Sequence, residues 1–275
     1  MAPQNSPFIL IRGAGDLASG VALRLFRSGF GVVMTEVNQP LSVRRRASFS
    51  EAVFDGQAVV EGVQALRVQT DSETLQTLKA GKIAVRIDPE AECLHSLPFL
   101  AVVDARMLKS TMPAISRLEV FTVGLGPGFT GGENCAAAVE TNRGPNLGRV
   151  LWQGSTQPDT TEPESVLGKR DERVIRAPAA GTLLTRREIA DLVAPGALIA
   201  EIDGVPIEAP FKAIIRGLLR DHTRVERGQK LGDLDPRCDP ELCFKASDKA
   251  LAMGGGVLEA LLSNPSIRRA LGEAG

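Results

Sequence analysis

The sequence predicts an α/β protein in which a mostly parallel sheet is followed by a small β domain and a C-terminal helix that returns to the first domain. Three observations lead to this prediction. In the first half, short β-branched runs alternate with amphipathic stretches, as they do in βαβ units. The polar segment 153–173 then precedes a segment with an internal repeat. An apolar stretch, 257–262, follows three consecutive glycines near the end of the chain.

Six strands and two helices are expected in the first half. The strand candidates are Phe8–Ile11, Val32–Glu36, Ala65–Val68, Lys82–Ile87, Leu100–Val103 and Val120–Val123. Apolar residues at helical spacing predict a helix over Leu17–Ser28, and a second helix is expected over Asp71–Ala80 with Gly81 at its end. The order strand, helix, strand within the first forty residues is typical of a parallel sheet.

Composition places the boundaries of this organisation and excludes some partners. We expect a first domain over 1–152, a linker over 153–173, a repeat domain over 174–237 and a tail with a helix over 238–275. The 275 residues include 32 basic and 33 acidic ones, so the net charge of −1 gives no positive field for nucleic acid. Aromatic residues make up only 4%, which leaves few stacking platforms for single strands.

The sequence also predicts the compartment. Before the short apolar run Phe8–Ile11 there is no basic residue, and no run of eighteen apolar residues occurs, so we expect neither a signal peptide nor a spanning helix. Four cysteines, Cys93, Cys135, Cys238 and Cys243, are too few for a disulfide framework. We therefore expect a cytoplasmic protein with reduced thiols, no membrane partner and no metal site.

The repeat in the second half has an offset of 32 residues. Ala177-Pro178 returns as Ala209-Pro210, Gly196 as Gly228 and Asp203 as Asp235. Two such halves can share one core as a small closed β sandwich. The segments Ala177–Gly181 and Val225–Leu231 resemble the APxxG and VxxGxxL signatures of the barrel-sandwich hybrid in biotinyl and lipoyl domains. The connection 185–188 has no lysine hairpin, so we do not expect a carrier of biotin or lipoate.

A glycine fingerprint of the form G-x-G-x-x-A follows the first strand and opens the first helix. Its six residues are Gly13, Ala14, Gly15, Asp16, Leu17 and Ala18. Such a turn lets the backbone and the helix N-terminus approach a pyrophosphate, as in Rossmann-like domains that bind nucleotides. Glu36 ends the second strand where these folds place the acid that binds a ribose hydroxyl. The negative charge of Asp16 argues against a standard NAD mode, and a turn that has lost its ligand is the alternative.

Two further segments are candidates for ligand contact. Arg44, in the run Arg44–Arg46 after the second strand, would meet a phosphate or lie on a solvated turn. The loop Gly124–Gly132 follows the last predicted strand, and its exposed backbone at Gly124, Gly126 and Gly128 suits an anion or a flat ring. A flexible turn between domains fits this composition equally well.

A few charged residues and histidines complete the candidates. Asp104, Arg106 and Lys109 follow the preceding strand and would face the same crevice or solvent. His95 and His222 are the only histidines, and neither lies in a nucleophile elbow, so hydrolysis by a Ser-His-Asp triad is not expected.

Several long motifs occur in an order that resembles one family. These motifs are IRGAGDLASGVALRLFRSGF, EVNQPLSVRRRASFSEAVFDG, GLGPGFTGGENCAAAVETNRG, LGRVLWQGS and SDKALAMGGGVLEALL. Together they are similar to the YqeB-type accessory proteins of selenium-dependent molybdenum hydroxylases. The resemblance implies a cytoplasmic maturation factor for such a hydroxylase, with the molybdenum cofactor or its selenium ligand as cargo.

Three functional classes remain open at this point. The leading hypothesis is an accessory protein that binds a nucleotide-containing anion, such as molybdopterin dinucleotide, and has a molybdenum hydroxylase as its partner. An NAD(P)-dependent oxidoreductase explains Gly13, Gly15, Ala18 and Glu36 equally well. A docking scaffold built on the repeat domain would need no small ligand. Whether the chain catalyses a reaction, and whether it forms homo-oligomers, is left open by the sequence.

Overall fold

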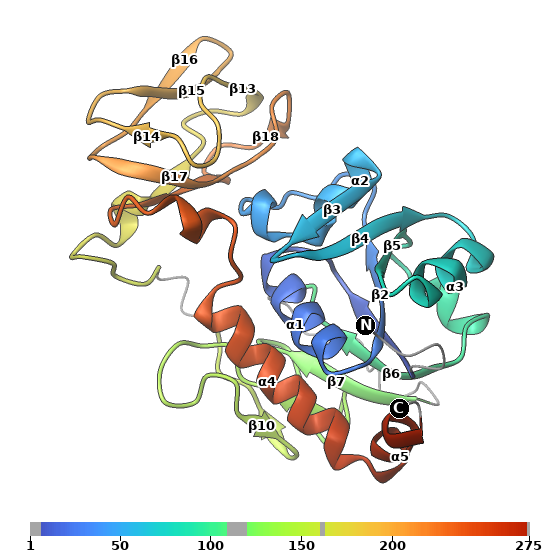
Figure 1. The fold of residues 1–275 in the computed structure, drawn as a ribbon. Coiled ribbons are helices and arrows are strands. Elements are labelled where there is room, and N and C mark those ends of the chain that lie inside the picture. The colour runs from blue at the N-terminus through green and yellow to red at the C-terminus, as the bar shows by residue number, and fades with distance from the viewer. Residues whose placement is uncertain (1–6, 109–119, 160–162, 274–275) are drawn as a thin grey trace. The chain divides into compact units, whose positions relative to one another are not determined.

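The computed structural model describes residues 7–108, 120–159 and 163–273, and the chain forms two compact units. The first unit consists of Met1–Pro40, Ser48–Thr160 and Ala246–Gly275, and the second of Leu41–Ala47 and Thr161–Lys245. The second unit therefore takes a short segment from the middle of the expected first domain. Figure 1 shows the order of the elements along the chain.

The first unit is built on a mixed sheet that has nine strands within the described residues. Their order is β10-β9-β7-β6-β1-β2-β5-β4-β3. The strands are β1 (Phe8–Arg12), β2 (Gly31–Glu36), β3 (Gln57–Val60), β4 (Val63–Val68), β5 (Ile83–Ile87), β6 (Phe99–Asp104), β7 (Phe121–Leu125), β9 (Ala137–Val139) and β10 (Val150–Leu151). Neighbours pair in parallel from β9 to β4, and only the edge strands β10 and β3 are antiparallel. The α/β class and the largely parallel sheet are thus confirmed.

Both faces of this sheet are covered. Successive residues of β1 enter two different cores: Ile9 and Ile11 lie in one and Leu10 in the other. The first core includes α1 (Asp16–Arg27) and α4 (Asp248–Ser263), and the second includes α3 (Asp71–Lys79). Because both faces of a parallel strand are buried, its sequence is continuously apolar rather than alternating.

The C-terminal segment returns to the first unit, but its glycines act differently from our expectation. The helix was expected to begin after Gly256, and instead α4 runs through all three glycines. A Cβ on Gly254 would lie 2.8 Å from Arg24 Cγ, and one on Gly256 would lie 2.2 Å from the carbonyl oxygen of Gly148. In Figure 1, α4 lies beside α1. The glycines permit this close approach, which outweighs their low helix propensity.

The smaller elements of the first unit lie between these layers and at the end of the chain. They are η2 (Phe49–Glu51), α2 (Ala52–Asp55), η3 (Glu92–His95), the two-stranded sheet of β8 (Thr130–Gly131) and β11 (Gly154–Ser155), and α5 (Pro265–Glu273). The strand β11 begins the segment that we expected to be a linker. Within the described residues, no helix combines the length and apolar character that crossing a membrane requires.

The second unit contains two four-stranded antiparallel sheets, of order β12-β19-β17-β14 and β16-β15-β13-β18. The strands are β12 (Val174–Arg176), β13 (Gly181–Thr185), β14 (Leu192–Val193), β15 (Leu198–Ile202), β16 (Val205–Glu208), β17 (Ala213–Leu218), β18 (Arg224–Val225) and β19 (Lys230–Asp235). The short turns η1 (Arg45–Ala47), η5 (Asp171–Arg173) and η6 (Pro240–Cys243) complete this unit.

The repeat explains how these two sheets are built. The offset of 32 residues relates β12 to β16, β13 to β17, β14 to β18 and β15 to β19. Replacing each strand of the first sheet by its equivalent gives the strand order of the second sheet. Each copy of the repeat therefore contributes two strands to each sheet. Equivalent positions fill the shared core: Leu183 and Ile215 are fully buried, and so are Ile199 and Leu231. Neither copy can bury its apolar side chains alone, which is why the two halves interleave.

Candidate functional site

The turn after β1 needs glycine at its first position for two reasons. Gly13 has φ +97°, a conformation that L residues rarely adopt. A Cβ at Gly13 would lie 3.2 Å from the carbonyl oxygen of Ala105, in the loop after β6. The N–H of Gly13 donates to the carbonyl oxygen of Thr35 at 2.8 Å. This glycine therefore fixes the turn between its two neighbouring strands.

Gly15 differs because its backbone does not require glycine. It is the N-cap of α1 with φ −64° and ψ −179°, which any residue can adopt. A glycine also has no side chain to cap the helix, whereas Thr70 and Ser247 cap α3 and α4 with their hydroxyl groups. The first-turn N–H groups of α1 thus lack the usual cap, as in helices that bind an anion at this end.

The remaining residues of the fingerprint differ in their exposure to solvent. Ala14 and Ala18 are buried, so they serve packing. The carbonyl oxygen of Ala14 accepts hydrogen bonds from the N–H of Ser50 and the hydroxyl of Ser19. Gly15, Asp16 and Leu17 are half-exposed and form the accessible part of the turn.

Glu36 lies at the predicted place and holds the turn. One carboxylate oxygen accepts a hydrogen bond from the N–H of Ala14 at 2.8 Å, and the other accepts one from the N–H of Val37 at 2.8 Å. Each oxygen retains a further lone pair, since a carboxylate accepts about four hydrogen bonds. Glu36 thus shapes the loop, and its role towards a ribose stays a prediction.

Two arginines surround a buried carboxylate where β1 and β6 end. Asp104 is fully buried and accepts hydrogen bonds from Nε and Nη2 of Arg106 at 3.0 and 2.6 Å. Nη1 of Arg12 lies 3.8 Å from the same carboxylate, and its Nη2 donates to the carbonyl oxygen of Pro89. Nε of Arg12 is buried without a hydrogen-bond partner among the described residues. Burial, and next the charge of Arg106, lower the pKa of Arg12.

The cluster of Arg12, Asp104 and Arg106 lies at a position in the sheet where ligands commonly bind. The strand order reverses between β1 and β6, because the chain continues from β1 to β2 on one side and reaches β6 only later on the other. Ligands of open α/β sheets bind at such switch points, beyond the carboxyl ends of the strands. Asp104 and Arg106 were expected near this crevice from the sequence, whereas Arg12 was not. Its place directly before the glycine turn was the available signal.

A lysine on α4 adds positive charge beside the first turn of α1. Lys249 precedes Ala250, and a Cβ on Gly20 of α1 would lie 2.4 Å from the Cβ of Ala250. Burial, and next the charge of Arg143, lower the pKa of Lys249, while Asp16 acts in the opposite direction. Asp159 and Glu140 act on this pKa in the same direction as Asp16, so the positive charge of Lys249 is shared among three carboxylates. No local pattern in the sequence identifies this lysine, since only the packing of α4 on α1 brings it to the turn.

The second glycine-rich loop has its space filled by the protein. A Cβ on Gly124 would lie 2.2 Å from the ring of Phe129. Gly126 has φ +76°, and its Cβ would lie 2.7 Å from the hydroxyl oxygen of Thr141. The carbonyl oxygen of Gly128 accepts a hydrogen bond from the side-chain amide of Asn134. Packing and turn geometry account for these glycines, so ligand contact at this loop stays a prediction.

Arg44 lies in the second unit, where it is buried. Its Nη2 donates to the carbonyl oxygens of Leu242 and Lys245 at 3.1 and 2.8 Å, which fastens Leu41–Ala47 to the segment around η6. Val43 supports this attachment, because its carbonyl oxygen accepts the N–H of Leu218 at the end of β17. The bonds give Arg44 a structural role within this unit.

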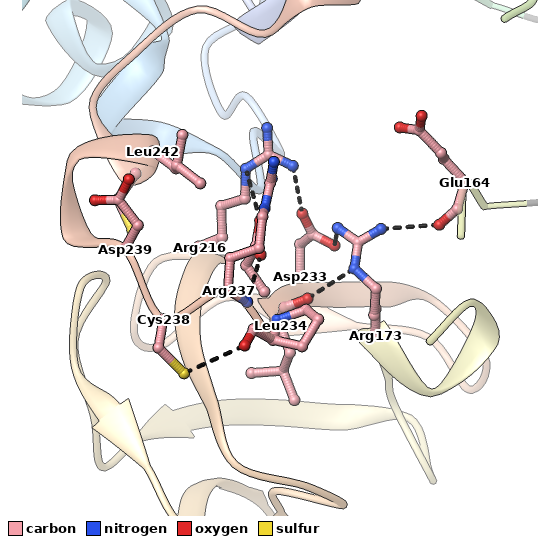
Figure 2. Close-up of polar contacts among 12 residues, drawn as sticks. Glu164, Arg173, Arg216, Asp233, Leu234, Arg237, Cys238, Asp239 and Leu242 are labelled. Carbon is pink, nitrogen blue, oxygen red and sulfur yellow. Dashed lines mark hydrogen bonds and ion pairs between the residues drawn. The ribbon is translucent and has the colours of Figure 1, made fainter. Parts of the chain in front are cut away.

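A second set of arginines surrounds two aspartates of β19, and Figure 2 shows one of them, Asp233, with Arg173 and Arg216. Asp233 lies between Arg173 at 3.3 Å and Arg216 at 3.5 Å. Asp235 is fully buried, and Nη2 of Arg237 approaches it at 2.6 Å. Burial acts to raise the pKa of Asp235, but hydrogen bonds from Arg237 outweigh it and lower this pKa. The network ties η5 and the segment after β19 to the sheet.

The other candidates give no reactive site. Burial raises the pKa of the thiols of Cys93 and Cys135, to about 12 and about 11, and also raises that of Cys243. His95 and His222 are exposed. Lys109 lies outside the described residues. Within the described part of the chain, no group of three or more His, Cys, Asp and Glu side chains could hold a metal ion.

Comparison with solved structures and with family models adds little to this geometry. No protein-family model matches the chain. An aspartoacylase family protein from Mesorhizobium loti is 13% identical with a TM-score of 0.26, covering 83% of this chain and 85% of that one. The ectoine utilization protein EutE (DoeB) from Ruegeria pomeroyi is 12% identical with a TM-score of 0.27, at 83% and 85% coverage. Likenesses this low carry no argument about the site.

A curated sequence gives a much stronger match. The chain is 45% identical over 260 residues to the uncharacterized protein YqeB of Escherichia coli (strain K12). These residues are 94% of this chain and 48% of that protein, so the chain spans about half the length of the relative that it matches. The similarity covers nearly the whole chain and supports the YqeB family, in agreement with the resemblance of its motifs.

Proposed function

We propose that the chain binds a nucleotide-containing anion at Gly13–Ala18 and acts in the cytoplasm as an accessory protein in the maturation of a molybdenum hydroxylase. One observation carries the binding half of this proposal. Gly15 opens α1 in a conformation that needs no glycine, and it leaves the helix without a side-chain cap. A residue without a side chain is needed there when a ligand approaches the backbone closely.

The charges around this turn support an anionic ligand. A Cβ on Gly13 would lie 3.4 Å from Cα of Arg106, so that arginine begins beside the turn. On the α4 side, Lys249 adds a positive charge that it shares among Asp16, Asp159 and Glu140. The partial positive charge of the helix N-terminus adds to both cations. A pyrophosphate, as found in molybdopterin dinucleotide, has the charge that this position favours.

The maturation half rests on the motif resemblance alone. Mass spectrometry of ligands released from the purified protein tests both halves together. We expect a pterin dinucleotide or another nucleotide, and we expect a molybdenum hydroxylase to co-purify with the chain. A protein that releases no nucleotide, and whose melting temperature does not change with any nucleotide or pterin dinucleotide, would contradict the proposal.

An NAD(P)-dependent oxidoreductase is the second candidate, and Lys249 is the observation that favours it. A half-buried lysine with a lowered pKa beside a nucleotide turn has the character of a proton donor. Absorbance at 340 nm of NADH or NADPH, followed with a panel of small carbonyl compounds, separates the two candidates. Turnover that disappears in Lys249→Met would establish the oxidoreductase. Nucleotide binding without turnover supports the accessory protein.

We also propose that the second unit is a barrel-sandwich hybrid that docks the partner enzyme. The interchange of its two sheets by one repeat supports this architecture. Limited proteolysis of the full chain should cut first within 153–173 and leave residues 174–235 resistant, because both copies share one core. First cleavage inside the repeat would contradict a single closed module.

A further inference from the structure

A cavity of about 380 Å³ opens at the carboxyl ends of β4 and β5, along the same edge of the sheet as the proposed nucleotide turn. It is lined by Arg67, Val68, Gln69, Arg86, Ile87, Asp88 and Glu92. This volume falls in the range of pockets that hold small ligands. None of these residues belongs to the glycine turn, so the cavity is a separate feature of the same sheet edge.

The lining combines an apolar surface with fixed polar groups. Val68 is buried, while Ile87 is 42% exposed although its side chain is large and apolar. The guanidinium group of Arg86 is held by Asp71 at 2.5 Å and by the hydroxyl of Thr74 at 3.1 Å. Asp88 is likewise fixed, since its carboxylate accepts the N–H groups of Glu92 and Cys93.

These groups suit a flat heterocycle with hydrogen-bonding edges. Ile87 offers an exposed apolar surface for the ring, whereas Val68 packs in the core on the other face of the sheet. The rim contributes donors from Arg67 and Gln69 and an acceptor from Glu92. A binding site of this type fixes orientation with a few polar groups and gains affinity from apolar contact.

The position of the cavity matches the far end of a nucleotide whose pyrophosphate lies at Gly13–Ala18. Strands β1, β2, β5 and β4 are successive neighbours in the sheet. At about 4.8 Å per strand, the cavity lies roughly 10–14 Å from the end of β1. Glu36, on the intervening strand, pairs with Ile87. The order along the edge is therefore turn, ribose-binding acid and cavity.

Hydrogen bonds join these parts into one continuous edge. The N–H of Asp88 donates to the carbonyl oxygen of Glu36 at 3.0 Å. The side chain of Arg12 reaches from β1 to the carbonyl oxygen of Pro89, in the loop after β5. The turn, Glu36 and the cavity are thus held at fixed separations, which a ligand spanning all three requires.

We propose that this cavity binds the base of the nucleotide and so selects a nucleoside diphosphate over free pyrophosphate. The inference rests on the proposed nucleotide binding at Gly13–Ala18 and adds the site of the base to it. The apolar surface and the polar rim then supply affinity that an inorganic anion cannot obtain. Selection among bases would come from the rim residues Arg67, Gln69 and Glu92.

Titration calorimetry with pyrophosphate, ADP, GDP and CDP tests this inference on the full chain. We expect at least one nucleoside diphosphate to bind the wild type about tenfold or more tightly than pyrophosphate. Ile87→Trp fills the cavity from an exposed position, so it should remove this advantage and leave pyrophosphate binding in place. Val59→Trp is the matched control, because Val59 is 59% exposed on β3 and does not line the cavity.

The variants separate this inference from the proposed function. If Ile87→Trp keeps the full preference for the nucleoside diphosphate, or if the wild type shows none, the cavity does not bind the base. If Gly15→Val binds pyrophosphate and nucleotides as the wild type does, nucleotide binding at the turn itself is wrong. Should Ile87→Trp fail to fold, the double variant of the exposed residues Gln69→Ala and Glu92→Ala must reduce the same preference, or the inference is overturned.

Discussion

The two glycine-rich loops of the first unit lie at the same edge of the sheet, yet they use glycine differently. In the loop after β7, the ring of Phe129 occupies the space beside Gly124, and Thr141 closes on Gly126. In the turn after β1, Gly13 has a positive φ, but Gly15 has an ordinary one. The second loop is thus explained by its own packing, whereas the first contains a glycine that its backbone does not explain.

This difference shows that a high glycine content does not identify a binding loop. A glycine that packs against its own protein contributes to stability, and its replacement should unfold the chain. A glycine with an ordinary conformation at an uncapped helix start should instead affect a ligand. Substitutions in the two loops can therefore be compared directly.

The largest effect on stability is expected for Gly124→Ala. Its Cβ would lie 2.2 Å from the ring of the buried Phe129, so the core must shift, at a cost of about 3 kcal/mol in the free energy of unfolding. Urea denaturation measures this cost. Phe129→Ala in the same chain should recover part of it, as a double-mutant cycle would show. Equal stability of Gly124→Ala and wild type would contradict the packing role of this loop.

A smaller loss of stability is expected for Glu36→Ala, which tests whether this carboxylate shapes the turn after β1. The variant leaves the buried N–H of Ala14 without its acceptor, at a cost of about 2 kcal/mol. Since Glu36 holds the turn, affinity for pyrophosphate should fall along with affinity for nucleotides. Glu36→Gln keeps one acceptor oxygen and should lose less stability. If pyrophosphate binding by Glu36→Ala is unchanged in calorimetry, the carboxylate does not shape the anion site.

The smallest effect is expected for Lys249→Met, which should weaken pyrophosphate binding by an amount that depends on pH. The lowered pKa means that Lys249 loses its charge at a lower pH than an exposed lysine. Affinity for pyrophosphate should therefore decrease as the pH rises through this pKa, and the variant should lack this decrease. Below that pH the variant should bind with about 1.5 kcal/mol less free energy.

The matching control is Lys79→Met, on the exposed end of α3, which should retain the wild-type pH profile. Without a ligand, the free energy of unfolding should depend on pH in the opposite direction to the affinity for pyrophosphate. Between the lowered pKa and the usual one, the unfolded chain binds more protons, so the contribution of Lys249 to the stability of the folded chain rises with pH. A pH profile of Lys249→Met identical to that of the wild type would remove this lysine from the site.

Most of the sheet could be predicted because parallel strands buried on both faces have continuous β-branched runs, as in β1 and β2. The short strands could not be predicted in this way. Ala137–Val139 contains two alanines, and Val150–Leu151 has only two residues, so neither shows a strand pattern. The transfer of Leu41–Ala47 to the second unit has no signal in composition either, since it depends on bonds from Val43 and Arg44 to distant residues.

The site could be predicted only where it is local in sequence. The glycine turn and Glu36 follow from the order of strand, turn, helix and strand. Lys249 comes to the turn through tertiary packing, which no pattern within one segment reveals, whereas Arg12 directly precedes the turn and could have been identified from the sequence. The glycines of α4 misled the prediction for the same reason, because Gly254 and Gly256 pack against Arg24 and Gly148, which are distant in sequence.

Calorimetry of Gly15→Val with pyrophosphate tests the central claim most directly. The φ and ψ of Gly15 are open to any residue, so we expect the variant to fold, which urea denaturation checks. Gly255→Ala is the control, since a Cβ there meets no atom within 4 Å. We expect the control to bind pyrophosphate as the wild type does and Gly15→Val to bind it at least about 100-fold more weakly. A folded Gly15→Val with unchanged affinity would contradict an anion site at this turn.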